Sequence, residues 1–491
     1  MRSRRLSPCL RYEQWSTTSP TARPVDDRPR HILAALLAAF GLSALAACAS
    51  VPEVNSVVES PRVASTSPTL VSANGPLTPQ ESRVVLSRLQ QEAGGNNLLR
   101  RHLAVEQAVA GGPLTIGNRT RLLRDGPESF AAVFAAIRAA KHHINLEYYI
   151  LQDIAYDGQH LGELLQAKRR AGVQVNIIYD SYGSIDTPVA FFDSLKSAGV
   201  NLVEFNPLNP LAAKGGYAPN ARDHRKILIV DGARAILGGV NLSTTYEGSA
   251  FSGASKRAAE TPEHWRDTDI EIEGPAIAEV QKLFLESWRR QGGPALADAA
   301  FFPTARAEGS EIVRIVGSTP NDSIPRYYAT LVSAIDSAEK SVWITTAYFV
   351  PTDQEVTSLK RAARRGVDVR LLLPGESDAP LALARGHFHY EDLMDAGVKI
   401  FETHGEVLHS KTTVIDGVWS AVGSSNFDHR SVLFNDEIDA IVLGPRTAAQ
   451  LEAFFEQDLR NATPVDPQAW GDRPLPEKAE EVFTLFWEKM L

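Results

Sequence analysis

The chain has 491 residues, of which 44% are hydrophobic and 22% are charged, and its formal net charge at pH 7 is −9. This composition is typical of a folded globular protein and excludes a fibrous or intrinsically disordered chain. The net negative charge disfavours a general nucleic-acid binder, since affinity for phosphate backbones needs clustered Lys and Arg. A chain of this length exceeds one ordinary hydrophobic core, so we expect at least two domains.

Residues 1–47 have the pattern of an export signal. Arg28 and Arg30 precede an uncharged stretch over residues 32–47, which ends in small residues directly before Cys48. A basic flank, an apolar segment and a small-residue cleavage site are the three parts of such a signal. The ending Leu45-Ala46-Ala47-Cys48 resembles the lipobox of bacterial lipoproteins, which implies cleavage before Cys48 and lipid attachment to it.

An uncleaved membrane anchor is the alternative for this segment. A helix over residues 32–47 would span about 24 Å, short of the roughly 30 Å hydrocarbon core of a bilayer, which favours cleavage. Against a signal, about thirty residues precede the apolar stretch, which is long for a basic region. Ala49 and Ser50 carry no acidic retention signal, and this resembles sorting to an outer membrane. We therefore expect a lipid-anchored protein on the exported side of a bacterial envelope, with the outer membrane, on its periplasmic side, as the favoured place.

The rest of the chain divides by composition. Residues 48–77 are rich in Ser, Pro, Val and Thr without a helical period, which predicts a tether. An N-terminal helical segment is expected over 78–112, because Thr78-Pro79-Gln80-Glu81 supplies an N-cap, a first-turn proline and a capping-box glutamate. From about residue 113, strand and helix patterns alternate, which predicts an α/β fold with mixed sheets flanked by helices. The expected helices are 130–140, 160–171 and 355–365, and the expected strands are 144–151, 173–179, 342–350 and 366–373.

The second half of the chain repeats the order of the first. Gly172-Val173-Gln174-Val175 corresponds to Gly366-Val367-Asp368-Val369, and Ala198-Gly199-Val200 corresponds to Ala396-Gly397-Val398. The period of about 190 residues indicates a duplicated domain, because solenoid repeats are far shorter. We expect two domains of one architecture over residues 113–300 and 301–491, with the boundary near 293–312.

Each half contains one polar motif on an apolar, β-branched segment. The first is His224-Arg225-Lys226 with Asp231, followed by Gly238-Gly239-Val240-Asn241; the second is His409-Ser410-Lys411 with Asp416, followed by Gly423-Ser424-Ser425-Asn426. The segments predict strands, on which a His and a Lys two residues apart share a face. Each aspartate lies an odd number of residues from its histidine, so we expect Asp231 and Asp416 to face away and to brace the strand end and turn. A single such motif could be an exposed strand edge, but two in matching repeats indicate a site.

The residue types in these motifs suit phosphoryl chemistry. Histidine can attack phosphorus or move a proton near neutral pH. Lysine and asparagine can hold the non-bridging oxygens as negative charge builds on them. Two such sets could hold one phosphodiester from opposite sides, one histidine attacking and the other protonating the leaving oxygen. One chain would suffice for one site, and the oligomeric state stays open.

These motifs resemble the signature of the phospholipase D superfamily, H-x-K-x4-D with G-S/G-x-N, and are similar in particular to bacterial cardiolipin-synthase-like phosphatidyltransferases. The resemblance extends from about residue 113 to the C-terminus and implies a shared active site at a pseudo-twofold interface. The supporting segments are Gly117-Asn118, Leu122-Leu123-Arg124-Asp125-Gly126, Glu147-Tyr148-Tyr149-Ile150, Trp265-Arg266-Asp267, Glu273-Gly274-Pro275, Tyr348-Phe349-Val350-Pro351 and Asn426-Phe427-Asp428-His429-Arg430-Ser431 with Asn435 and Glu437.

The resemblance also implies roles for single residues. His224 would be the nucleophile and His409 the acid, and an acidic residue just beyond each motif, Asp267 or Glu437, would orient that motif's histidine. Lys226, Lys411, Asn241, Asn426 and Ser424 would complete the set. Gly239 stands where the second motif has Ser424, so we expect the first half-site to lack one hydroxyl donor. Glu147, Tyr148 and Tyr348 could line the pocket, although strand tyrosines more often pack in a core.

The resemblance implies no metal and no cofactor, and it implies phospholipid substrates at a membrane surface. The expected reaction transfers a phosphatidyl group through phosphohistidine to an alcohol, with phosphatidylglycerol as the preferred acceptor. Three alternatives stay open: a hydrolytic phospholipase D, a nuclease of the same superfamily, and a lipid-binding protein with an inactive site. The acidity of the chain disfavours the nuclease, and both intact His-x-Lys motifs disfavour the inactive protein.

Overall fold

The computed structural model describes residues 51, 53–54, 68–95, 97–213, 217–246, 265–297, 300–474, 478 and 481–486. The expected export signal, Cys48 and the greater part of the expected tether lie outside these residues. Residues 49–491 belong to one compact unit, which contains both halves of the duplication. Within the described ranges, no helix is both long enough and apolar enough to cross a bilayer.

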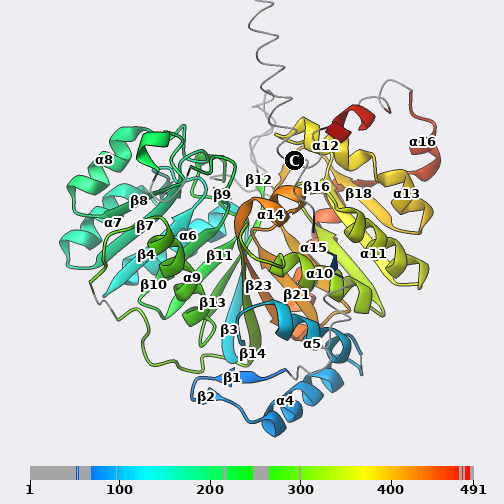
Figure 1. The fold of residues 1–491 in the computed structure, drawn as a ribbon, viewed down its shortest axis with the longest axis horizontal. Coiled ribbons are helices and arrows are strands. Elements are labelled where there is room, and N and C mark those ends of the chain that lie inside the picture. The colour runs from blue at the N-terminus through cyan, green and yellow to red at the C-terminus, as the bar shows by residue number, and fades with distance from the viewer. Residues whose placement is uncertain are drawn as a thin grey trace, which may run out of the picture. The chain divides into compact units, whose positions relative to one another are not determined.

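The first half is built on a mixed sheet (Figure 1). Its strands follow the order β8–β7–β4–β10–β11–β13–β3, in which β8, β7 and β4 are parallel and the remaining neighbours are antiparallel. The bounds are β3 (Leu114–Arg124), β4 (His143–Tyr148), β7 (Gln174–Asp180), β8 (Asn201–Phe205), β10 (Lys226–Val230), β11 (Arg234–Gly238) and β13 (Thr268–Glu273).

The second half repeats this sheet strand for strand. The order is β18–β17–β15–β20–β21–β23–β14, with the same parallel and antiparallel neighbours at the same places. The bounds are β14 (Glu311–Ser318), β15 (Ser341–Thr345), β17 (Asp368–Pro374), β18 (Lys399–Thr403), β20 (Thr412–Ile415), β21 (Trp419–Gly423) and β23 (Asn435–Leu443), and β24 (Ala462–Pro464) adds to β18. This correspondence confirms the expected duplication and the expected mixed α/β fold.

The two sheets are joined and packed together. β3 pairs antiparallel with β14, which makes the sheets continuous at this edge. Alternate residues of β10 then face different cores: Ile227 and Ile229 pack with strands of the second half, whereas Leu228 and Val230 pack under the helices of the first. A strand buried on both faces needs an apolar residue at each position, which explains the continuous apolar runs in the motif segments.

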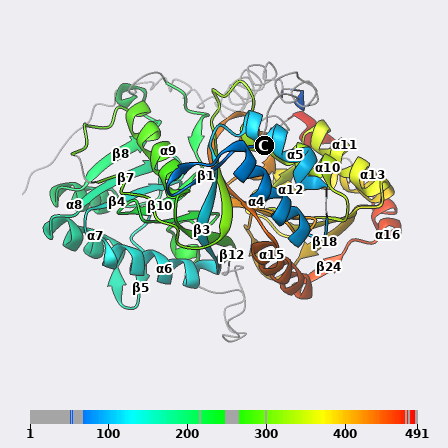
Figure 2. The same cartoon turned by 90° about the horizontal axis from the view of Figure 1, so that it is seen from below.

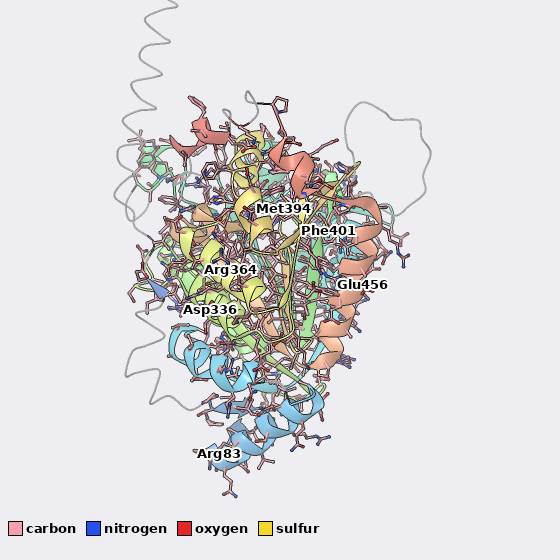
Figure 3. All side chains as sticks on the ribbon, turned by 90° about the vertical axis from the view of Figure 1, so that its right-hand side faces the viewer. Arg83, Asp336, Arg364, Met394, Phe401 and Glu456 are labelled. Carbon is pink, nitrogen blue, oxygen red and sulfur yellow. The ribbon has the colours of Figure 1, made fainter. Side chains whose placement is uncertain are left out.

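Helices pack on both faces of the sheets. The first half carries α6 (Asp125–Ala139), α7 (Leu161–Arg170), α8 (Val189–Ser197) and α9 (Ile277–Arg290). The second carries α10 (Arg326–Ser337), α11 (Asp353–Arg364), α12 (Pro380–His387), α13 (Tyr390–Asp395), α14 (His429–Leu433), α15 (Pro445–Asp458) and α16 (Pro467–Gly471). Of these, α9 and α15 contribute to the core that the two halves share. Figure 3 shows Arg364 of α11 and Glu456 of α15 on opposite sides of Phe401 in β18, so the second sheet lies between two helical layers.

The segment before the first domain packs on both halves. It contains a hairpin of β1 (Leu70–Ser72) and β2 (Gly75–Pro76), followed by α4 (Pro79–Glu92) and α5 (Leu98–Val109). These elements lie together at the bottom of Figure 1, and Figure 2, seen from below, shows β1, α4 and α5 facing the viewer. The predicted capping box at the start of α4 is confirmed, since Thr78 and Glu81 hydrogen-bond reciprocally. The predicted tether is wrong in its last residues: Leu70 is fully buried and β1 pairs with β3, because the sheet offers a free edge there.

Several element boundaries differ from the expectation at the carboxyl ends of the strands. The strand expected over 144–151 ends at Tyr148, and the strand expected over 342–350 is split into β15 and the short β16 (Phe349–Val350). The strands of the two motifs begin only at Lys226 and Thr412, after the histidines. At each of these places the chain leaves the sheet to build the wall of a cavity, and sequence periodicity does not reveal where that departure occurs. The helix expected over 130–140 begins five residues earlier, at Asp125, and is α6 (Asp125–Ala139).

Candidate active site

Short strand pairs that cross between the halves position the two histidines. β9 (Arg222–Asp223) pairs with β23, and β12 (Trp265–Arg266) pairs with β19 (Val407–Leu408). The main-chain N–H of His224 donates to Asp436 O at 2.9 Å, and that of His409 donates to Arg266 O at 2.8 Å. Each histidine is therefore fixed by the backbone of the opposite half, which brings together motifs that lie far apart in the sequence.

The His224 ring is oriented through its Nδ1 atom. This atom lies 3.1 Å from Glu437 Oε2 and 3.1 Å from the main-chain carbonyl of Ser424. A carbonyl oxygen can only accept, so Nδ1 carries the proton of the ring and Nε2 holds the lone pair. Three side chains donate to the Glu437 carboxylate in turn: Ser424, Ser431 and Asn435.

The His409 ring is oriented in a similar way by the other half. Its Nδ1 lies 2.7 Å from Asp267 Oδ2 and 2.9 Å from the Tyr246 hydroxyl. Lys411 Nζ also lies 2.7 Å from His409 Nδ1. The ring packs against Trp265, with centroids 4.9 Å apart.

The expected pairing of acids with histidines is wrong. The resemblance implied that Asp267 would orient His224 and that Glu437 would orient His409, each within its own half. The structure pairs Glu437 with His224 and Asp267 with His409. The reason is geometric, because β23 runs beside β9 of the first half and β12 runs beside β19 of the second.

Both histidines open onto one cavity of about 200 Å³. Asn241 and Asn426 also line it, and Oδ1 of Asn241 accepts the main-chain N–H of Ile150 at 3.1 Å. The other lining residues are Tyr149, Ile150, Arg222, Trp265, Tyr348, Asp378, Asp428, Arg430 and Asn435. A larger hollow of about 790 Å³ runs along α8 and β8, but neither histidine lines it, so the chemistry belongs to the smaller cavity.

The two lysines lie behind the histidines and do not line the cavity themselves. Lys226 Nζ donates to His224 O at 2.7 Å and lies 5.3 Å from the ring centre of Tyr149. Lys411 Nζ donates to His409 O in the same manner. The two half-sites thus share one local design, in which the lysine folds back on the main chain of its own histidine.

Burial dominates the protonation of the site. It lowers the pKa of Lys226 to about 7, with the charge of Lys411 adding to the effect. It lowers the pKa of Lys411 to about 8 and raises the pKa of Asp267 to about 6. Burial also lowers the pKa of both histidines, which favours neutral rings.

Glu437 is the exception among these groups. Burial raises its pKa, but the charges of His224 and Lys226 and the hydrogen bonds from His224 and Ser424 outweigh burial. The net result is a pKa below the ordinary value for a glutamate. Glu437 is therefore the more firmly ionised of the two orienting carboxylates.

The expectation for Ser424 and Gly239 is also corrected. Ser424 is fully buried, and its hydroxyl donates to Glu437 without lining the cavity. Gly239 does not simply lack a hydroxyl donor, because the position has no room for a side chain. A Cβ atom there would lie 2.1 Å from Asp267 Oδ1. The shorter aspartate reaches His409 only because the backbone of residue 239 leaves room for its carboxylate.

Asp231 and Asp416 lie in hairpin turns outside the cavity lining. The Asp231 carboxylate accepts the main-chain N–H groups of residues 141–143, and Asp416 accepts those of residues 339–341. Both residues have positive φ, at 53° and 56°. Each one ties the end of a motif strand to the start of the neighbouring strand, β4 or β15.

Sequence reasoning missed Tyr246 and a second pair of buried acids. Asp269 Oδ1 accepts the Val240 N–H at 3.1 Å, and Asp439 Oδ2 accepts the Ser425 hydroxyl at 2.6 Å. Burial raises the pKa of Asp269 to about 7. The signal was present as an acidic residue two positions after each orienting acid, since residues i and i+2 of a strand share a face. Tyr246 gave no such signal.

The three accessory residues named from the sequence have different places. Tyr348 lines the cavity and donates its hydroxyl to Asp378 at 2.8 Å. Glu147 and Tyr148 are buried in the first half and do not line the cavity. Within the part of the chain that the structure describes, there is no group of three or more His, Cys, Asp or Glu residues that could hold a metal ion.

Comparison with known proteins agrees with this geometry. The chain matches the family model described as "Cardiolipin synthase, PLD-like domain" over residues 133–251 and 331–459, one match in each half. A cardiolipin synthase of Geobacillus kaustophilus is 32% identical over 398 residues, covering 80% of this chain and 76% of the relative. A cardiolipin synthase of Geobacillus thermodenitrificans is 33% identical over 399 residues, with the same coverage of 80% and 76%.

A solved structure shares the fold. The phosphatidylserine synthase of Haemophilus influenzae aligns with a TM-score of 0.55 at 13% identity, covering 79% of this chain and 99% of that chain. At this identity the likeness concerns the fold alone. The family match over both halves, the relatives above 30% identity and the paired His-x-Lys motifs at one cavity show that the chain belongs to the cardiolipin synthase family of phospholipase-D-like enzymes and is a phosphatidyltransferase.

Proposed function

We propose that the chain forms cardiolipin by transferring a phosphatidyl group, through a phosphohistidine, to the headgroup hydroxyl of phosphatidylglycerol. One observation carries the mechanism: two histidines, each held at Nδ1 by a carboxylate of the opposite half, line a single cavity. The names of the relatives in the family support the acceptor.

The structure favours His224 as the nucleophile. Its Nδ1 faces only acceptors, Glu437 and a carbonyl, so its tautomer leaves a lone pair on Nε2. The Nδ1 of His409 faces both an acceptor, Asp267, and a donor, the ammonium of Lys411, so the same tautomer is less firmly imposed there. A neutral ring with a fixed lone pair is the form that attacks phosphorus.

The reaction then takes two balanced steps. His409 enters the first step as an imidazolium, which the Asp267 carboxylate at its Nδ1 and the negative charge of the bound phosphodiester favour over the neutral ring of the free enzyme. Nε2 of His224 forms a bond to phosphorus as the bond to the leaving alcohol oxygen breaks, and His409 gives that oxygen a proton and becomes neutral. In the second step, the acceptor hydroxyl gives its proton to His409 and attacks phosphorus. The bond from phosphorus to His224 breaks, and both histidines return to their starting forms.

The remaining expected residues hold the reacting phosphate in this proposal. Lys226 and Lys411 would turn from the main-chain carbonyls toward the non-bridging oxygens, where a negative charge favours their protonated forms. Asn241 and Asn426 line the cavity on its two sides and can donate to the same oxygens. Asp267 and Glu437 act through the histidines that they orient.

The place of action is part of the proposal. Phospholipid substrates require access to a membrane, and the Leu-Ala-Ala-Cys sequence supports lipid attachment at Cys48 on the exported side of a bacterial envelope. A lipid-modified Cys48 would carry most of the attachment to the membrane.

Product analysis tests the acceptor. Vesicles of labelled phosphatidylglycerol should yield cardiolipin and glycerol in equal amounts, identified by mass. Phosphatidic acid as the main product would instead identify a hydrolytic phospholipase D. No turnover of any phospholipid by protein of verified fold would contradict the proposed function.

Acid-quench trapping tests the two histidines. With a nitrophenyl phosphodiester, His409→Ala should still accumulate labelled protein, because this leaving group needs little protonation, whereas His224→Ala should not. Label in His224→Ala but not in His409→Ala would reverse the roles. No label on turning-over unsubstituted enzyme, under a quench shown to preserve phosphohistidine, would exclude the covalent step.

A further inference from the structure

Large apolar side chains are exposed at one end of the molecule, on equivalent segments of the two halves. In the first half they follow β7: Ile185 is 60% exposed and Val189, at the start of α8, is 72% exposed. In the second half they follow β17, the counterpart of β7: Leu381, in α12, is 42% exposed. Figure 1 shows α8 and α12 at the same end of the ribbon, on either side of α14.

Both segments border the catalytic cavity. The Ser184 hydroxyl donates to the main-chain carbonyl of Tyr149, a cavity residue, at 3.0 Å. Asp378 lies two residues before α12, lines the cavity and accepts the Tyr348 hydroxyl. The exposed apolar side chains do not line the cavity themselves, and Ile185 and Val189 line the larger hollow along α8, but they lie on segments that adjoin the cavity.

The C-terminal turn extends the apolar area of the second half. A 3-10 turn over Thr484–Phe486 packs against α12, while Leu485 stays exposed. We give the name mouth surface to the exposed apolar set on and beside the two segments that adjoin the cavity, which consists of Tyr182, Ile185, Val189, Leu381, Phe388 and Leu485.

The position of the mouth surface points to its partner. Exposed apolar groups that gather on one face mark a surface that is covered in function. In the proposed function, the cavity that their segments adjoin accepts a phosphodiester, and in a phospholipid that group lies directly beside the apolar part of a bilayer. We propose that the mouth surface docks on a phospholipid bilayer, so that the cavity opens directly onto the headgroup layer. This inference rests on the proposed function.

The course of the N-terminal chain is compatible with this docking. Val54 is buried against Tyr328 and Val432, and its N–H donates to Gln354 Oε1 at 2.8 Å. Val432 belongs to α14, the helix that carries the cavity residue Arg430. Cys48 precedes Val54 by six residues, a reach of at most about 20 Å. The same cluster contains Val109 of α5, so a lipid on Cys48 would hold the enzyme close to the membrane without selecting the end that faces it.

Site-specific fluorescence on the full chain tests the orientation. Ile185→Cys and Phe388→Cys, labelled with acrylodan, should shift to shorter wavelength when phosphatidylglycerol vesicles are added. Val84 is the matched control: it is 64% exposed on α4, at the opposite end of the molecule in Figure 1, and Val84→Cys should show no shift. The unsubstituted chain gives the background of Cys9 and Cys48. Equal shifts at all three positions, or a shift at residue 84 alone, would overturn the proposal.

Kinetics separate docking from chemistry. Ile185→Ser with Val189→Ser should raise the apparent KM for phosphatidylglycerol in vesicles about tenfold, since each side chain loses apolar contact with lipid. Turnover of a soluble nitrophenyl phosphodiester should stay unchanged, and Val84→Ser should change neither. An unchanged KM on vesicles refutes docking even if the enzyme is active. Loss of both activities in a folded double variant also counts against it, and an inactive unsubstituted enzyme would refute the proposed function itself.

Discussion

Gly239 and Ser424 occupy the same position in the two halves, yet they serve different acids. In the first half the acid is Asp267, which is one methylene shorter than Glu437 and needs the backbone of residue 239 close to it. In the second half the longer Glu437 leaves space for a side chain, and the Ser424 hydroxyl donates to it. The two half-sites therefore orient their histidines with different side chains in equivalent places.

Replacing Gly239 tests this relation. In Gly239→Ala the new methyl group meets Asp267 and displaces it from His409, so kcat/KM for phosphatidylglycerol should fall about a hundredfold or more, as for a lost orienting group. Folding, followed by circular dichroism, should be retained. Gly471→Ala is the control, since no atom lies within 4 Å of a Cβ there, and it should keep full activity. An equally active Gly239→Ala enzyme would show that Asp267 does not need that space.

The lowered pKa of Lys226 predicts a pH dependence. Its pKa of about 7 means that the ammonium form is lost as pH rises through that value. Because kcat/KM reports the free enzyme, it should decline on the alkaline side from about pH 7 to 8 with a soluble phosphodiester. The arginine in Lys226→Arg keeps its charge over this whole pH range, so the decline in kcat/KM should move to higher pH. An unchanged profile in an active Lys226→Arg enzyme would assign the decline to another group, with Lys411 next to be tested.

At the scale of elements, buried ion pairs hold the crossing strands in place. Arg266 of β12 contacts Asp458, the last residue of α15, with Nη2 and Oδ2 2.9 Å apart. Arg124 binds the same carboxylate, and Arg266 also donates to the main-chain carbonyl of Asp267. Through these contacts, a helix of the second half fixes the acid that orients His409.

Asp458→Ala should be strongly destabilising. The change leaves two buried guanidinium groups without their shared carboxylate, which costs about 3–5 kcal/mol in buried pairs. The free energy of unfolding in urea measures this loss. Glu92→Ala breaks an exposed pair with Arg88 and should cost about 0.5 kcal/mol or less. A loss for Asp458→Ala as small as that of the control would mean that the carboxylate contributes nothing to the junction.

At the scale of the whole molecule, one chain supplies both halves of one site. The histidines come from different halves, and each is fixed by the main chain and an acid of the opposite half. Neither half alone contains one of the two cavity histidines together with the acid that orients it. The duplication therefore yields one composite site and not two separate ones.

Co-expression tests this arrangement with full-length chains. Cells that produce His224→Ala and His409→Ala together should show no activity, because each chain carries its own defect in its only site. Co-expression of the unsubstituted chain with His224→Ala serves as the positive control. Activity from the two defective chains together would mean that halves of different chains combine, as in a swapped dimer.

The sequence alone determined the duplication, the α/β fold, the motif residues and the chemistry that they suit. These features are local or periodic: an i, i+2 spacing sets the face of a strand, and a capping box sets the start of α4. The paired His-x-Lys motifs were recognisable because residue type and spacing survive in both copies. Asp231 and Asp416 do brace the strand ends and turns as expected, but they do so from turns with positive φ, so the parity argument along an unbroken strand does not apply to them.

Only the tertiary structure decided which acid serves which histidine, why Gly239 is a glycine, and what Ser424 contacts. Each of these depends on strands that meet across the interface between the halves, such as β9 with β23 and β12 with β19. Pairing between segments 142 or 213 residues apart leaves no periodic trace in either segment, because the hydrogen bonds run through the main chain. Close approach is likewise a property of the packed chain: that a Cβ atom at residue 239 would lie only 2.1 Å from Asp267 Oδ1 becomes visible only after the chain has folded.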